Sequence, residues 1–148
     1  MADGYNPANY EASRRTVEYD YGRNSANNAY GRFLSQQRGS RQLSDMSRGF
    51  ERGYPGLQAN LNRRGVSGAG INSGIETGAM QRYLGDFTRN YGRAQVDFDQ
   101  EQQQYDIGQQ LLDQWRQGAL ADLGLNEQND ISAAASNIEA LRAYLGGL

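Results

Sequence analysis

The chain has 148 residues, enough for one ordinary domain, and a formal net charge of −2. Only 25 of these residues are Leu, Ile, Val or Phe, a share below the roughly 20% at which disorder becomes common. Cys, His and Lys are absent, which excludes thiolate chemistry, histidine bases and ligands, and lysine Schiff bases. We therefore expect no large private core and none of the commonest enzyme mechanisms.

Residues 1–64 form a segment rich in Tyr, Arg and Gly, which predicts short, broken helices joined by loops. Ser25 and Ser40 are candidate helix caps, and Gly39 is a candidate stop between them. Tyr54-Pro55-Gly56 predicts a turn, with one more helical turn before a glycine-rich hinge. The three short helices expected upstream of this turn span 8–20, 25–39 and 40–50.

The predicted hinge covers residues 65–74, where four glycines disfavour regular structure. Ser73 and Glu76 then have the spacing of a capping box, which predicts the start of a helix. Apolar and aromatic residues follow at strict intervals of four and three, the heptad pattern of a helix whose seam faces a partner. Glu101 and Gly108 interrupt this seam. Its other members are Met80, Leu84, Phe87, Tyr91, Ala94, Phe98, Tyr105, Leu112, Trp115 and Ala119.

A second, shorter helix is expected after Gly124, capped by Asn126. Its apolar positions repeat at intervals of three and four: Ile131, Ala134, Ile138, Leu141, Leu145 and Leu148. Residues 75–148 thus predict a helical hairpin whose long arm of roughly 48 residues would span about 70 Å. The expected fold is all-α and elongated, with short broken helices leading into this hairpin, ordered by oligomerisation or by a partner.

Three glycines fall seven residues apart on one face of the long helix: Gly78, Gly85 and Gly92. Each costs about 0.5–1 kcal/mol relative to alanine within a helix, so we expect another backbone to lie close against this face. Residues 1–95 carry net charge +5 and residues 96–148 carry −7. The two halves are expected to attract each other, or the matching halves of neighbouring copies.

Few residues here suggest catalysis or metal binding. Asp97, Asp99 and Glu101 resemble the start of an EF-hand loop, but the sixth position is Gln102 and the twelfth is Gly108. We expect no catalytic, cofactor or metal site. A carboxylate-dependent hydrolase acting on cell-wall polymer is the remaining enzymatic alternative, and it would need a preformed cleft.

Arginine and tyrosine alternate in several places, including Tyr-Gly-Arg at 21–23, 30–32 and 91–93. Such sequences bind single-stranded nucleic acid by charge and stacking, and they also suit protein interfaces. The absence of Lys favours the interface. We expect no signal peptide and no membrane contact, since no long apolar run occurs and the long helix carries Gln and Asp on its polar face.

The Gly-rich loop after Arg63, followed by Tyr83-Leu84-Gly85-Asp86-Phe87 and a Gln-rich helix, resembles small virion structural proteins of tailed bacteriophages. The resemblance covers about residues 63–148. It implies a non-enzymatic virion component near the portal, neck or tail, such as a head–tail connector or coiled-coil tail protein, with other virion proteins, capsid subunits included, and its own copies as partners. The alternative function is an Arg/Tyr-rich single-stranded nucleic-acid-binding protein with a helical oligomerisation tail.

Overall fold

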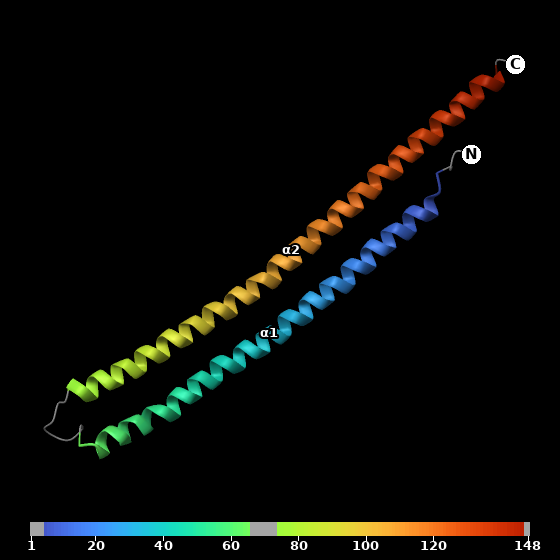
Figure 1. The fold of residues 1–148 in the computed structure, drawn as a ribbon. Coiled ribbons are helices and arrows are strands. Elements are labelled where there is room, and N and C mark those ends of the chain that lie inside the picture. The colour runs from blue at the N-terminus through green and yellow to red at the C-terminus, as the bar shows by residue number, and fades with distance from the viewer. Residues whose placement is uncertain (1–4, 66–73, 147–148) are drawn as a thin grey trace. The chain divides into compact units, whose positions relative to one another are not determined.

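The computed structural model describes residues 5–65 and 74–146. Within these residues the protein consists of two long helices and contains no strand (Figure 1). Helix α1 spans Pro7–Arg63 and helix α2 spans Gly74–Gly146. The expected all-α fold class is confirmed.

The chain divides into two compact units, and each unit contains one stretch of both helices. The terminal unit comprises Met1–Ala29 and Asp106–Leu148, and the central unit is Tyr30–Tyr105. In each unit the two stretches pack antiparallel: in the terminal unit Tyr10 bonds to Asp130 and Tyr21 to Asp113.

Both ends of α1 follow from local chemistry. The Asn6 side chain accepts a hydrogen bond from the backbone N–H of Ala8 at 3.1 Å, and Pro7 occupies the first helical position, where its missing N–H costs nothing. At the other end, Gly65 has a φ of 69° and donates its N–H to the carbonyl of Asn62 at 3.1 Å. Glycine adopts this left-handed conformation without strain, so the predicted helix end before Gly65 is confirmed.

The expectation of short, broken helices over 1–64 is wrong, because α1 is one continuous helix of 57 residues. It runs through the expected stop at Gly39 and through the expected turn at Tyr54-Pro55-Gly56. Helix propensity is a weak preference that packing overrides. Here Phe50 packs on Tyr83 and Phe87 of α2, and these contacts support the helix beside Pro55.

The expected break at Gly124 is also wrong. Helix α2 continues through Gly124 and Asn126, so residues 126–146 belong to the long helix and form no separate short arm. The hairpin expected inside 75–148 is replaced by packing of α2 on α1. Residues 66–73, which include most of the expected hinge and the capping Ser73, lie outside the described residues, and α2 begins at Gly74.

The core between the helices is thin. Among the described residues, Leu61 is the only buried hydrophobic side chain, with 9% of its surface exposed, and Ser35 is the only buried polar one. The other side chains between α1 and α2 are half-buried. The stability of the fold therefore depends on individual contacts spread along each unit.

Candidate interaction surfaces

An aromatic cluster forms the main apolar contact of the central unit. The ring of Phe50 on α1 lies 4.3 Å from that of Phe87 and 5.2 Å from that of Tyr83, both on α2. Tyr54 and Tyr91 extend the cluster along each helix, with centroid distances of 5.8 Å to Phe50 and 5.4 Å to Phe87. Aromatic pairs at these separations contribute about 0.5–1.5 kcal/mol each beyond the area they bury.

Small residues on α1 accommodate large side chains of α2 further along the central unit. A Cβ added at Gly39 would overlap the ring of Phe98, and one added at Gly31 would come within 2.8 Å of the ring of Tyr105. Between these two glycines, the hydroxyl of fully buried Ser35 accepts a hydrogen bond from Gln102 at 3.0 Å. The two helices can lie close together between Gly31 and Gly39 because α1 has only glycine or serine at the positions that face the large side chains of α2.

The terminal unit is held mainly by polar contacts. Three tyrosines of α1 or its approach donate hydrogen bonds to carboxylates of α2: Tyr5 to Glu127, Tyr10 to Asp130, and Tyr21 to Asp113. These contacts hold neighbouring turns of the two helices together where few apolar residues are available.

Arginine adds ion pairs to this ladder. Arg116 of α2 makes a bidentate pair with Glu18 at 2.8 and 2.9 Å, and its guanidinium lies 4.9 Å from the ring centre of Tyr21. Arg14 pairs with Glu127. Exposed pairs of this kind are worth little singly, and the bidentate geometry of Arg116 makes it the best placed of them.

These hydrogen bonds shift the pKa values of the tyrosines. The bond to Asp130 raises the pKa of Tyr10 from 10.0 to about 12, because ionising the phenol would place two negative charges side by side. The bonds to Glu127 and Asp113 raise the pKa values of Tyr5 and Tyr21 in the same way.

We expect the terminal unit to lose stability as the pH rises from 10 to about 12. Since the pKa of Tyr10 is higher in the folded chain, its bond to Asp130 contributes fully below pH 10 and is lost as the pH passes about 12. Helicity and tyrosinate absorbance, followed together against pH, should change over that interval. Tyr10→Phe should remove the step near pH 12, whereas Tyr19→Phe, which removes an exposed hydroxyl and leaves the bond between Tyr10 and Asp130 in place, should keep that step. Because Tyr5 and Tyr21 also have raised pKa values, the assignment would be contradicted by a step near pH 12 that keeps its full amplitude in Tyr10→Phe.

The predicted seam residues divide into two groups. Six in the central unit are half-buried between the helices: Met80, Phe87, Tyr91, Ala94, Phe98 and Tyr105. Leu112 and Ala119 are half-buried in the terminal unit. Leu84 and Trp115 are exposed, and their neighbours Tyr83 and Arg116 contact α1 instead. A strict 3.5-residue spacing drifts about 20° per heptad on a straight helix, which moves some members off the contact line.

The C-terminal members of the pattern are mostly exposed. We call Ile131, Ala134, Ile138, Leu141 and Leu145 the C-terminal stripe. All but Ala134 are exposed, and Ile138 and Leu141 keep 53% and 60% of their surface accessible. Among the described residues, no hydrogen bond, ion pair or ring contact joins α1 to α2 beyond Asp130, at the start of this stripe.

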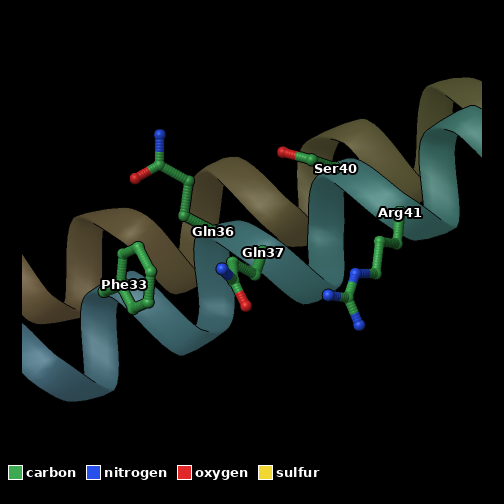
Figure 2. Close-up of a pocket in the computed structure, with 5 residues that line it drawn as sticks. All are labelled: Phe33, Gln36, Gln37, Ser40 and Arg41. Carbon is green, nitrogen blue, oxygen red and sulfur yellow. The ribbon is translucent and has the colours of Figure 1, made fainter.

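A basic and aromatic face lies on the solvent side of α1 in the central unit. It contains Tyr30, Phe33, Gln37, Arg41, Arg48 and Arg52, which recur at intervals of three, four or seven residues and so share one face of the helix. Figure 2 shows the shallow hollow at its middle, lined by residues of α1 alone from Phe33 to Arg41. The three arginines have no ion-pair partner among the described residues.

The glycine face of α2 is open. Nothing lies within 4 Å of a Cβ added at Gly78, Gly85 or Gly92, and a hollow runs beside the first two. No described residue of this chain packs closely against these glycines, although the sequence predicts that another backbone does. Close packing on this face therefore stays a prediction, and a partner chain would have to supply the backbone.

Sequence reasoning missed three residues that hold the helices together: Ser35, Tyr83 and Gln102. Tyr83 stands one position before an expected seam residue, and the two polar side chains carry no hydrophobic signal.

Ion pairs join the basic half of the chain to the acidic half, as the pair of Arg38 with Glu101 at 3.8 Å illustrates.

Residues 5–65 and 74–146 contain no group of three acidic side chains placed to hold a metal ion, and Asp97 and Asp99 lie on the exposed side of α2. Within the same residues, neither helix has a stretch apolar enough to cross a bilayer.

No known protein family, curated protein or solved structure matches the chain.

Proposed function

We propose that this chain is a non-enzymatic structural or adaptor component of a tailed-bacteriophage virion, located near the portal, neck or tail. Its helices would pack onto copies of the chain and onto larger virion proteins. The proposal extends the resemblance of residues 63–148 to small phage structural proteins.

The observation that carries the proposal is the imbalance between a thin core and many exposed apolar side chains. Leu61 is the only buried hydrophobic residue described, whereas α2 exposes a series of large hydrophobic side chains: Leu84, Val96, Ile107, Leu111, Trp115, Leu125, Ile131, Ile138, Leu141 and Leu145. Exposed apolar residues in such number are typical of proteins that complete their burial against neighbours in an assembly.

Quantitative mass spectrometry of purified particles tests the location. A copy number that matches the rotational symmetry of a portal or tail would support an adaptor on that axis. Hundreds of copies per particle would instead indicate a capsid component. Absence from purified particles would overturn the proposal.

Replacing Phe87 and Phe98 by Asp is expected to abolish incorporation, but those side chains contact α1 of the same chain. Loss of incorporation would then follow from misfolding alone. Leu111→Asp is the sharper variant, because Leu111 is 60% exposed and its replacement should leave the helix pair intact. We expect circular dichroism of this variant to match the native chain while its copy number per particle falls.

A second candidate function, single-stranded nucleic-acid binding, is favoured by the basic and aromatic face of α1. Three arginines without ion-pair partners there line up with exposed Tyr30 and Phe33, an arrangement suited to phosphate contact and base stacking. Binding to single-stranded RNA or DNA should weaken steeply with salt, and the salt dependence should flatten in Arg41→Gln/Arg48→Gln/Arg52→Gln. Binding that is absent or insensitive to salt would exclude this function.

A further inference from the structure

We propose that the C-terminal stripe of α2 is a self-association surface, at which two copies of the chain pack antiparallel. The proposed function requires that copies of the chain pack together but does not say which surface they use, and this inference rests on the proposed function for that requirement. Self-association can be measured on the isolated chain, so either proposal can fail while the other stands.

The stripe continues an interface that already exists within the terminal unit. The face of α2 that carries Leu112, Ala119 and Glu127 packs against α1, and the same face continues along the helix as the stripe. Helix α1 begins at Pro7, and among the described residues its last hydrogen bond to α2 joins Tyr10 to Asp130. Beyond Asp130 the face is apolar and unpaired among the described residues.

A second copy fits this face because the spacing is symmetric. The intervals four, three and four from Ala134 to Leu145 are palindromic about a point between Ile138 and Leu141. In an antiparallel pair Ile138 would then lie opposite Leu141 of the second copy, and Ala134 opposite Leu145. The layer of Ala134 and Leu145 joins a small side chain with a large one, whereas a parallel pair would place Ala134 against Ala134 and leave a gap.

Charge and side-chain size favour the same arrangement. Residues 131–146 carry one acid, Glu139, and one base, Arg142, so two copies do not repel each other. Ala134 within the stripe and Ala135 beside it have small side chains, which allows the helix axes to approach closely there. At 1.5 Å per residue the contact is about 24 Å long, which suits a modest, reversible dimer.

Sedimentation of the full chain over a range of concentrations tests the surface. We expect a concentration-dependent dimer for the native chain and a monomer for Ile138→Asp/Leu141→Asp, with helicity unchanged since both positions are exposed. The matched control is Ala140→Asp/Ala143→Asp, which places two charges on the opposite face of the same turns and should leave the dimer intact. A monomeric native chain, or a dimer that survives Ile138→Asp/Leu141→Asp, would overturn the proposal.

Cysteine cross-linking tests the orientation, and the chain offers no background because it contains no cysteine. A mixture of Ala134→Cys and Leu145→Cys chains should form the mixed disulfide dimer. Either variant alone should not, since its two cysteines would lie about 16 Å apart along the axis, beyond the roughly 7 Å between Cα atoms that a disulfide allows. Efficient cross-linking of Ala134→Cys alone would show a parallel pair and overturn the antiparallel one. Absence of the mixed disulfide would indicate a different occupant of the stripe.

Discussion

A chain carrying Gly39→Leu should be less stable to denaturant than the native chain by about 1–3 kcal/mol, the usual cost of forcing extra atoms into a packed contact. Even a single Cβ at Gly39 would overlap the ring of Phe98, including the atoms nearest its backbone. The ring has little freedom to move away at that end. The two helices of the central unit would therefore have to separate locally, which would also weaken the bond between Gln102 and Ser35.

The control for this variant is Gly49→Leu. Gly49 is also inside α1, but nothing lies within 4 Å of a Cβ added there. Leucine at that position should stabilise the chain by about 0.8 kcal/mol through helix propensity alone. Opposite signs at the two glycines are thus expected from urea unfolding followed by circular dichroism.

A double-mutant cycle with Phe98→Ala completes the test. Removing the ring should relieve the cost of Gly39→Leu, so the two substitutions should be non-additive, with a coupling of about 1 kcal/mol or more. If Gly39→Leu stabilises the chain as much as Gly49→Leu does, Phe98 does not pack on Gly39.

The all-α class could be predicted from the sequence because it depends on local patterns. The end of α1 before Gly65 needs only a glycine after a helical stretch. The continuity of α1 could not be predicted, because glycine and proline favour breaks and only contacts from α2 offset that preference. Gly39 illustrates the difficulty: it resembles a helix stop, yet its missing side chain is what admits Phe98.

The contact line of α2 was partly predictable for a related reason. Apolar periodicity located Phe87 and Phe98, which do contact α1. It placed Leu84 on the seam, whereas Tyr83 makes the contact with α1. A repeat of 3.5 residues drifts around a straight helix that has 3.6 residues per turn, so a strict heptad pattern does not follow the true contact line. Polar partners such as Gln102 and Ser35 carry no pattern, since nothing in a single sequence pairs residues 67 positions apart.

Phe50→Ala should have the second large effect, a loss of about 2–3 kcal/mol in the free energy of unfolding. Fully buried phenylalanines cost about 3–5 kcal/mol when cut to alanine, and Phe50 is only half-buried. Its ring nevertheless contacts Phe87 and Tyr83 of α2 at 4.3 and 5.2 Å, so the substitution removes the centre of the aromatic cluster. The midpoint of urea unfolding, read by circular dichroism, should fall accordingly.

Phe33→Ala is the matched control, because it makes the same substitution in the same helix on the solvent side. Phe33 is 52% exposed and contacts no other aromatic ring in the described part of the chain, so its loss should change stability by no more than about 0.5 kcal/mol. The difference between the two variants measures what the aromatic cluster around Phe50 contributes to stability. If Phe50→Ala costs no more than Phe33→Ala, the aromatic cluster does not hold α1 to α2 in the isolated chain. The stability of the helix pair would then have to come from neighbours, which would strengthen the case for a chain ordered by its assembly.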